Sequence, residues 1–394
     1  MTTLSNEILL APGWSVPAVR EGEFKVCAQT VMDTSDPLIT FDEKGVCHYV
    51  QYFNEVIRPN WFPNEQGQQR LEQIVEQIKR ETRGKEYNCI IGLSGGVDSS
   101  YLAFLASQYG LRILAVHVDG GWNSELAVKN IQNIVTHCGI DLYTHVVDWE
   151  DMRELQLSFF KSGLANQDIP QDHAFFAALY HFAIRHQIRW VLHGGNAATE
   201  AILPEAWGYN AMDGRHLRDV HRKHSKHPLK SYPIINFFQH VIYYPYIRKM
   251  KQARLLNLVP YDKREAIRIL EREVGFRYYG GKHHESRFTR FFQAHILPLR
   301  YGYDKRKAHL SSMIVSGLMS REEAIEELKQ PLYPSMRDLE MDKTYFIKKL
   351  RIDEEQYQRY INQPTKSYTE YENNEALLKR MAAAKKKFKT VLSR

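Results

Sequence analysis

The sequence predicts an α/β protein: a parallel β-sheet flanked by helices, with a small irregular segment before it and a helical region after it. Three observations support this prediction. Apolar segments alternate with helical ones between residues 64 and 193, an order typical of βαβ units. The segments CIIGL, ILAVHV and WVLHG are apolar almost throughout, as parallel strands buried on both faces should be. Finally, three pairs of glycines follow predicted strands directly.

The elements are predicted in chain order from their periodicity. Prolines interrupt the first 60 residues, which we expect to be irregular. Residues 64–83 form a predicted amphipathic helix with Leu71, Ile74, Val75 and Ile78 on one face. The next elements are strand 87–93, helix 99–109, strand 112–118, helix 124–138, strand 142–147, helix 172–186 and strand 190–193. Later, residues 255–275 read as mostly helical, 320–328 as a short helix, and the charged tail from 335 as helical.

Composition predicts a soluble, cytoplasmic protein with a packed core. Hydrophobic residues make up 43% of the chain, and four cysteines are too few for a disulfide scaffold. The N-terminus lacks the pattern of a signal peptide, and no run of 18 apolar residues could span a membrane. The net charge of +7 suits an acidic or phosphorylated partner. The basic cluster near the C-terminus reads most simply as a solvated face.

The motif SGGVDS, from Ser94 to Ser99, lies between a predicted strand and a predicted helix. Glycines at 95 and 96 allow the backbone to bend sharply, and the free N–H groups of the helix favour an anion such as phosphate. The lysine of a Walker A loop is absent. We expect Asp98 at the tip of this loop, where its carboxylate could help to place Mg²⁺ on the phosphates.

Two further loops follow predicted strands, and the carboxyl ends of parallel strands meet at one edge of a sheet. The first contains Val116, His117, Val118 and Asp119, followed by a glycine pair. The second contains Gly194, Gly195 and Asn196. Both could be ordinary turns, but three glycine pairs at three strand ends favour a shared site.

The SGGVDS string resembles the PP-loop of the ATP pyrophosphatase superfamily, whose members grip the pyrophosphate of ATP and adenylate a substrate oxygen. Longer blocks, VMDTSDPLITFDEKGVCHY, DGGWNSELAVKNI, HGGNAATE and GGKHHESRFTRFFQAHILPLRYGYDKRKAHLSSMIVSGLMSREEA, resemble the bacterial N-acetyl sugar amidotransferase family. This resemblance covers most of residues 25–335. Members of that family act in the biosynthesis of lipopolysaccharide O-antigen and flagellar sugars.

The resemblance implies a ligase that uses ATP and Mg²⁺ to convert an acetamido group into an acetamidino group, releasing AMP and pyrophosphate. The substrate would be a nucleotide-linked or free N-acetylated sugar acid. No N-terminal catalytic cysteine or Gly-x-Cys-x-Gly elbow is present. Ammonia would therefore come, as the resemblance implies, from separate glutaminase and cyclase-like subunits. Nucleic acid and membrane are not expected partners, and the oligomeric state stays open.

The resemblance also implies roles for particular residues. Those expected to act in catalysis are Asp98, Ser99, Lys282 and Lys305. Those expected to bind the nucleotide are Ser94, Gly95, Gly96, Val97, Asp98, Ser99, Val116, His117, Val118, Asp119, Gly194, Gly195 and Asn196. Those expected to bind the substrate are Trp122, Asn123, Glu200, His283, Glu285 and Arg287. For the residues in GGKHHESRF, a simple helix cap is the alternative. Arg306 is a second candidate beside Lys305 for contacting the departing pyrophosphate.

On this basis the chain divides into an N-terminal segment (1–60), a PP-loop ATP pyrophosphatase domain (61–210), a family-specific substrate or partner region (211–334) and a helical basic tail (335–394). The sequence departs from the family in its two Cys-x-x-Cys knuckles, which would suit Zn²⁺. Cys27 and Cys47 are kept, but Thr30 and Val50 replace the second cysteines. We therefore expect no metal there, although His48 could supply a third ligand.

Two alternatives remain. The residues His216, His221, His224 and His227 lie in a polar, basic stretch that could bind a metal, contact a substrate phosphate or simply be solvated. As a whole, the protein could instead be a PP-loop enzyme that modifies tRNA by thiolation or lysidine formation, which its positive charge would suit. Against this, the four cysteines form no reactive or cluster-binding set. A non-catalytic scaffold would not need an intact SGGVDS motif.

Overall fold

Five parallel strands form the sheet at the centre of the computed structural model, which describes residues 24–281 and 285–381. Their order is β3-β2-β1-β4-β5, and all four neighbouring pairs are parallel. The strands are β1 (Cys89–Gly92), β2 (Ile113–Asp119), β3 (Asp141–Val146), β4 (Trp190–Leu192) and β5 (Lys251–Ala253). The α/β prediction is confirmed, and the four predicted strands agree within two residues at each end. The short β5, which follows residue 210, was not predicted because its three residues carry no apolar pattern.

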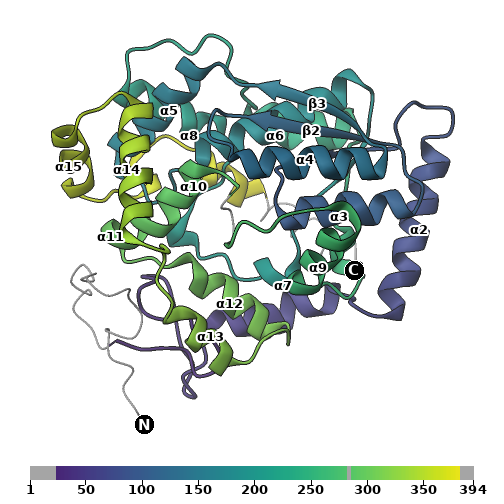
Figure 1. Ribbon diagram of the computed structural model, residues 1–394, viewed down its shortest axis with the longest axis horizontal. Helices are drawn as coiled ribbons and strands as arrows, with labels where there is room; N and C mark the ends of the chain where they lie inside the picture. Colours follow the sequence, from purple (N-terminus) through teal and green to yellow (C-terminus); the bar gives the residue numbers. More distant parts are fainter. Residues whose placement is uncertain (1–23, 282–284, 382–394) are drawn as a thin grey trace.

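The helices before the C-terminal region are α1 (His48–Tyr52), α2 (Glu65–Glu81), α3 (Val97–Gln108), α4 (Glu125–Cys138), α5 (Trp149–Ser162), α6 (Ile169–Arg185), α7 (Ala197–Glu200), α8 (Gly214–His224) and α9 (Lys263–Val274). The C-terminal region contains α10 (Arg287–Phe291), α11 (Leu297–Tyr301), α12 (Lys305–Val315), α13 (Arg321–Leu328), α14 (Met336–Leu350) and α15 (Glu354–Asn362). In Figure 1, α2 and α3 lie on one side of the molecule, and α14 and α15 lie on the opposite side. Within the described ranges, no helix is both long and apolar enough to cross a membrane.

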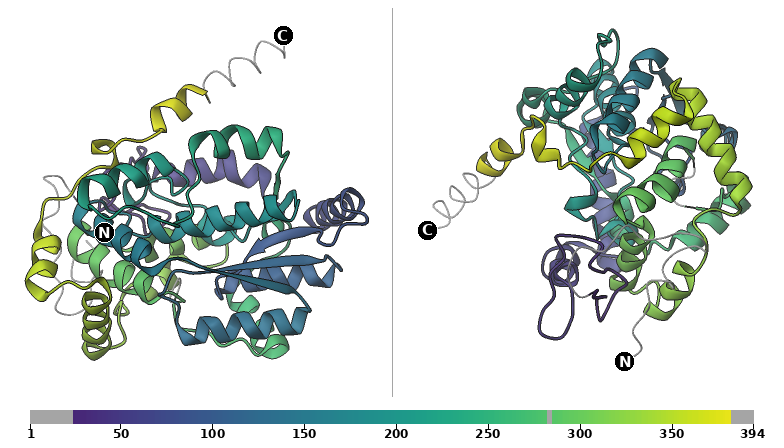
Figure 2. Two further views of the ribbon diagram at one scale, coloured as in Figure 1. Left: turned by 90° about the horizontal axis from the view of Figure 1, so that it is seen from above. Right: turned by 90° about the vertical axis from the view of Figure 1, so that its left-hand side faces the viewer.

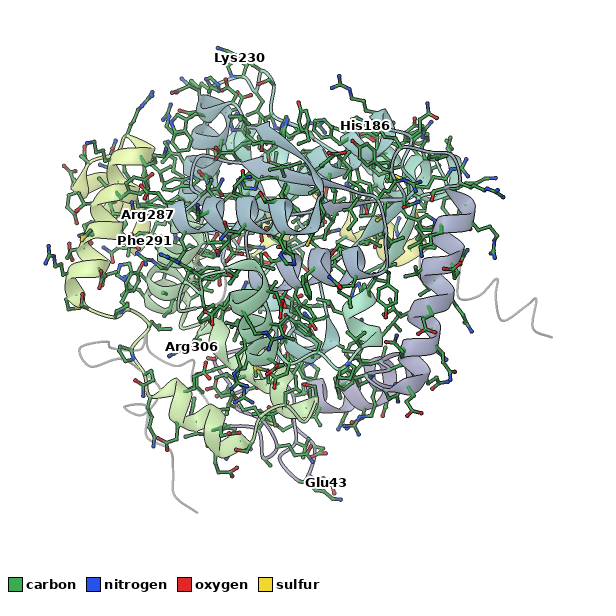
Figure 3. The ribbon with its side chains drawn as sticks, turned by 45° about the vertical axis from the view of Figure 1, so that its right-hand side comes forward. Glu43, His186, Lys230, Arg287, Phe291 and Arg306 are labelled. Carbon is green, nitrogen blue, oxygen red and sulfur yellow. The ribbon has the colours of Figure 1, made fainter. Side chains whose placement is uncertain are left out.

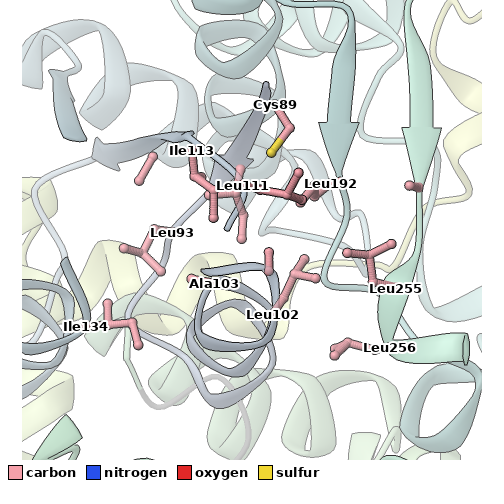
Figure 4. Packing of buried hydrophobic residues seen from close by; sticks show 14 of the residues in the cluster. Cys89, Leu93, Leu102, Ala103, Leu111, Ile113, Ile134, Leu192, Leu255 and Leu256 are labelled. Atoms are coloured by element: carbon pink, nitrogen blue, oxygen red, sulfur yellow. The ribbon is translucent and has the colours of Figure 1, made fainter. Parts of the chain in front are cut away.

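The sheet is covered on both faces, which explains the continuous apolar strands. Alternate residues such as Ile91 and Leu192 point to one face, where α2, α3, α4 and α9 pack. Figure 4 shows Leu102 and Ala103 of α3 beneath the strands at this face. The neighbours Ile90 and Val191 point to the opposite face, where α6 covers them. This alternation follows from the two-residue period of a strand.

The N-terminal segment packs against the C-terminal region rather than against the sheet. Cys27 and Cys47 share an apolar cluster with Ala308 of α12, while Val31 packs with Leu310 and with α13. Figure 2 shows this segment beside the green helices α12 and α13. The buried ion pair between Lys307 and Asp33 joins the same two parts. The N-terminal segment is therefore held to α12 and α13 by a small core of its own.

Candidate active site

The order of the strands determines where a ligand can enter. The chain proceeds outward from β1 through β2 to β3, and then crosses back to β4 on the other side of β1. In open α/β sheets, such a reversal leaves a crevice at the carboxyl ends of the two central strands. Here those strands are β1 and β4, which pair through Ile90 and Val191. The loop 94–99 and the loop 193–196 follow them directly.

The glycine loop after β1 is held by its own hydroxyl groups. Ser94 Oγ accepts a hydrogen bond from the Gly96 N–H at 3.1 Å, and Ser99 Oγ donates to the Gly96 carbonyl at 3.2 Å. Gly95 has a φ of +80°, and a Cβ there would lie 2.5 Å from the Ala127 carbonyl oxygen. Glycine is therefore required at 95, and the loop leads directly into the first turn of α3.

Asp98 connects three parts of this site. Its Oδ1 accepts a hydrogen bond from the Asn196 amide at 3.1 Å and another from the Tyr261 hydroxyl. The expectation that Asp98 lies at the tip of a loop is wrong, because it is the second residue of α3. Asn196 also caps α7, since its Oδ1 accepts from the Thr199 N–H at 3.0 Å. The loops after β1 and β4 are thus fixed to each other through one carboxylate.

His117 at the end of β2 is held as a neutral ring. Its Nδ1 lies 3.0 Å from the Leu93 carbonyl, to which only an N–H can donate. Its Nε2 lies 3.0 Å from the Asn123 amide nitrogen and so accepts that hydrogen bond. Burial lowers the pKa of His117, which agrees with this assignment. The ring therefore offers the site a fixed shape rather than a charge.

A cavity of about 380 Å³, here called the site cavity, opens at these strand ends. The sheet and its loops supply one side of it, through Ser94, Gly96, Val97, Asp98, Ser99, His117, Val118, Asn123, Gly194, Gly195 and Glu200. The other side comes from α6 and from later parts of the chain, through Asp168, Gln171, Asp172, Lys263, Tyr279, Glu285, Ser286, Thr289, Gln293 and Lys305. Most of the predicted site residues therefore meet in one place.

The segment 285–287 docks onto the loop after β2 through its backbone. Ser124 N–H donates to the Glu285 carbonyl at 2.8 Å, and Arg287 N–H donates to the Trp122 carbonyl at 2.9 Å. Asn123 and Ser286 form the antiparallel bridge between them. The Glu285 carboxylate lies over the glycine loop, because a Cβ on Gly96 would be 3.0 Å from its Oε1. This bridge brings Glu285 and Ser286 to the phosphate-type loop.

Six predicted residues do not line the site cavity. Four of them belong to the strand ends and loops that form the cavity but do not face it: Gly95, Val116, Asp119 and Asn196. Asn196, for example, donates a hydrogen bond to Asp98. Trp122 is buried in an aromatic core with Phe288 and Phe346, and its N–H donates to Gln156. Arg287, labelled in Figure 3, donates to the buried Asp342 at 3.0 Å and so joins α10 to α14. Trp122 is thus part of the core, whereas Arg287 is partly exposed and pairs with Asp342.

Of the two basic candidates at the start of α12, Lys305 lines the site cavity and Arg306 does not. The Arg306 guanidinium bonds to Asp304 and to the Gln330 carbonyl at 2.8 Å. Lys282 and His283 fall outside the described residues.

Several residues of the site cavity were not identified from the sequence. Asp168, Gln171 and Asp172 lie at the start of α6, and Thr289 and Gln293 follow the docked segment. The polar run NQDIPQDH before an apolar helix was the one signal that could have indicated them. The predicted helix began at residue 172, whereas α6 begins at residue 169. Lys263, at the start of α9, had no distinguishing pattern.

The two remaining cysteines of the knuckles lie close together in the N-terminal segment. Cys47 N–H donates to Cys27 Sγ at 3.2 Å, so these two residues are neighbours. Hydrogen bonds centred on Cys47 lower the pKa of Cys27 to about 5. Thr30 Oγ1 lies 3.8 Å from Cys47 Sγ, and Val50 packs in the same buried cluster. His48, the possible third ligand, uses its Nδ1 to accept a hydrogen bond from Thr40 N–H at 3.1 Å.

The histidines of the basic stretch build a helix and a turn. Residues 214–224 form α8, which the sequence analysis missed. His221 Nε2 lies 2.6 Å from the His227 carbonyl, and His227 lies 3.1 Å from the buried Asp151. Burial lowers the pKa of His216 to about 4. Across the described residues, no three His, Cys, Asp or Glu side chains gather to hold a metal ion.

Two regions of the chain match models of known protein families. Residues 285–385 match the C-terminal domain of WbpG-like LPS biosynthesis proteins, and residues 88–175 match the queuosine biosynthesis protein QueC. The chain thus contains one region similar to QueC and a second region similar to the C-terminal domain of WbpG-like proteins. The first match begins at Glu285, the residue that docks on the loop after β2. The second match contains β1, the glycine loop and the start of α6. Both matched regions contribute residues to the site cavity.

The similarity of this chain to curated proteins and to solved structures is low. No curated protein matches the chain. An NH3-dependent NAD synthetase from Campylobacter jejuni is 14% identical over 34% of this chain and 58% of its own, with a TM-score of 0.26. An NMN synthetase from Francisella tularensis is 16% identical over 54% of this chain and 88% of its own, with a TM-score of 0.29. The chain thus spans 58% of the length of the first of these. At these TM-scores the likeness says nothing about activity.

Proposed function

We propose that this protein is an ATP-dependent amidotransferase that converts the acetamido group of a nucleotide-linked or free sugar acid into an acetamidino group. One observation carries the proposal. The glycine loop after β1 and the WbpG-like segment that begins at Glu285 face the same cavity. A loop of this kind suits phosphate, and lipopolysaccharide biosynthesis needs modified sugars. The two matched regions would then contribute the nucleotide side and the sugar side of one active site.

The chemistry requires an activated amide oxygen. An amide oxygen leaves poorly, but adenylation turns it into the oxygen of a phosphate ester. Ammonia then attacks the carbon, AMP departs, and pyrophosphate has already been released. The enzyme must hold the amide beside the α-phosphate and admit ammonia before water. A cavity with one phosphate-type end and one polar end suits these requirements.

The residues of the site cavity fit ATP as a ligand. The N–H groups at the start of α3 and the close approach allowed by Gly95 and Gly96 suit the β- and γ-phosphates. Lys263 and Lys305 bring positive charge to the same cavity without a Walker lysine. We assign Asp98 to the magnesium ion and Lys305 to the departing pyrophosphate. Asn123, Glu200 and Glu285 are the residues we assign to the sugar.

Ammonia would be supplied by separate glutaminase and cyclase-like subunits, because the sequence contains no glutaminase elbow. The alternative of a tRNA-modifying enzyme is less well supported. All four cysteines are free: Cys27 and Cys47 are neighbours in the N-terminal segment, Cys89 lies in β1, and Cys138 ends α4. They do not converge on the site cavity, where a thiolase would need them. Binding of tRNA that weakens steeply with salt would restore this alternative.

The proposal is tested with the purified chain, ATP, Mg²⁺, ammonium chloride and a panel of free and UDP-linked acetamido sugar acids. Mass spectrometry should detect a product about one mass unit lighter, since C=O becomes C=NH. Nucleotide analysis should detect AMP and pyrophosphate in equal amounts. Formation of ADP and phosphate, or AMP formation only with tRNA, would overturn the proposal.

A further inference from the structure

Two carboxylates at the start of α6 line the site cavity and have no role in the proposed function so far. Asp168 and Asp172 are four residues apart at the start of one helix, so both lie on the same face. They lie on the side of the site cavity that is formed by α6 and the WbpG-like segment. Both side chains belong to the cavity that also contains the glycine loop.

The WbpG-like segment holds Asp168 as an acceptor. Its Oδ1 accepts from Thr289 Oγ1 at 2.9 Å, and its Oδ2 accepts from Gln293 Nε2 at 3.0 Å. Gln171 adds a longer contact at 3.4 Å and in turn accepts from Ser286 Oγ at 3.1 Å. Asp168 is therefore fixed in position, with both of its oxygens already engaged.

Asp172 is in a different situation. Its side chain is exposed to the site cavity, and within the described parts of the chain its carboxylate makes no hydrogen bond. The protein around the cavity keeps most bulk water away from this carboxylate. This desolvation and the neighbouring Asp168 raise the pKa of Asp172 to about 7, while Lys305 opposes the shift. The other ionisable side chains of the cavity include His193, Glu200, Glu285 and Lys263, on four other elements or loops. Two carboxylates with such unlike surroundings typically have unlike roles.

We propose that Asp172 is the general base that accepts a proton from the attacking nitrogen when the adenylated amide is converted into the amidine. This inference rests on the proposed function and deepens it. The C–N bond forms as ammonia attacks the imidate carbon, and the nitrogen gains a positive charge. Asp172 takes one proton from it, and the C–O bond to AMP breaks with its electron pair leaving on the phosphate oxygen. Asp168 holds the helix start in place through its hydrogen bonds to Thr289 and Gln293.

The experiment separates the two halves of the reaction. Full-length Asp172→Asn is compared with the wild type and with Glu355→Gln, a carboxylate-to-amide control on the exposed face of α15. The first half is followed without ammonium, as exchange of labelled pyrophosphate into ATP with the best sugar of the panel. The second half is followed as amidine formation with ammonium chloride. We expect Asp172→Asn to keep exchange within about threefold and to lose about 100-fold or more in amidine formation.

Two further readouts exclude a merely structural effect. Formate should partly restore amidine formation to Asp172→Ala, because it can occupy the space and accept the proton. At a fixed concentration of free NH3, the wild-type rate should fall as the pH drops below about 7, where Asp172 becomes protonated, and the rate of Asp172→Asn should lack this step. Unchanged amidine formation in Asp172→Asn, or an equal loss of exchange and amidine formation, would overturn the role of Asp172. Absence of exchange in the wild type would instead refute the proposed function, and this inference with it.

Discussion

The amide of Asn196 donates a hydrogen bond to the carboxylate of Asp98 at 3.1 Å, and so ties the loop after β4 to the first turn of α3. These two loops leave the sheet at the point where the strand order reverses. A ligand between them would touch both, which is the arrangement expected at a switch point. The single carboxylate thus has a structural role as well as the proposed catalytic one.

Replacement of Asp98 should separate these two roles. Asp98→Asn keeps an oxygen that can accept from Asn196 and Tyr261, so its stability should stay near that of the wild type. Asp98→Ala leaves the buried Tyr261 hydroxyl without its acceptor, which should cost about 1–3 kcal/mol of unfolding free energy. Both variants should lose at least about 100-fold in AMP formation. Thermal denaturation and nucleotide analysis measure the two effects, and an active Asp98→Asn would remove Asp98 from the proposed site.

Gly92 at the end of β1 should not tolerate a side chain. A Cβ there would lie 2.0 Å from the Phe175 ring, which lines the site cavity. Gly92→Ala should therefore lower the free energy of unfolding by about 1–3 kcal/mol and weaken ATP binding as the ring moves. Gly194→Ala is the matched control for stability, because its Cβ would meet its nearest neighbour, Ser99 N, at 3.6 Å. Equal melting temperatures for the two variants would contradict this packing argument.

The N-terminal knuckles should contain no stoichiometric zinc, because Thr30 and Val50 stand where two thiolates would be needed. Elemental analysis of the purified protein checks this. The double variant Thr30→Cys, Val50→Cys should gain about one zinc per chain, since Cys27 and Cys47 already lie side by side. Zinc in the wild type at this level would mean that His48 or another group completes the site.

Nitrogen delivery should require ammonia rather than glutamine when the chain acts alone. Glutamine by itself should give no amidine, whereas ammonium at high concentration should. With free ammonium, the rate should rise as the pH is made more alkaline, because only NH3 is nucleophilic. Addition of the cognate glutaminase pair should restore glutamine use and flatten this dependence. If the isolated chain used glutamine efficiently, Cys138→Ser would be the first variant to test.

Acid should destabilise the protein through its buried neutral histidines. His173 Nδ1 lies 2.7 Å from the Ala211 carbonyl and its Nε2 accepts from Ile235 N–H at 3.0 Å, so the ring must be neutral. Burial lowers the pKa of His173 to about 4. In the unfolded chain this pKa is about 6.5. This group's contribution to stability is therefore complete above pH 6.5 and is lost as the pH falls toward 4, by at most about 3 kcal/mol.

Denaturant unfolding between pH 7 and pH 4 measures this loss, and His173→Gln should show a shallower pH dependence than the wild type. His216 and His295, whose pKa values burial also lowers to about 4, should keep part of the slope. An identical slope in the variant would show that His173 is not neutral in the folded protein.

The sequence by itself determined the α/β class, four of the five strands and the glycine loop from Ser94 to Ser99. These features are local: a buried strand is continuously apolar, and a tight loop before a helix needs glycine and small hydroxyls. The same reasoning placed three glycine loops at one edge of the sheet, because parallel strands share their carboxyl ends. It also predicted a site role for the block GGKHHESRF, of which Glu285 lines the site cavity.

Only the tertiary structure decided which side chains face the site cavity. Trp122 and Arg287 look like site residues in sequence, but an aromatic core and the buried Asp342 hold them elsewhere. Asp168 and Asp172 look like an ordinary helix start, yet the docking of Ser286, Thr289 and Gln293 encloses them with the glycine loop. Residues more than 100 positions apart become neighbours through packing of their helices, and a local pattern contains no record of that packing.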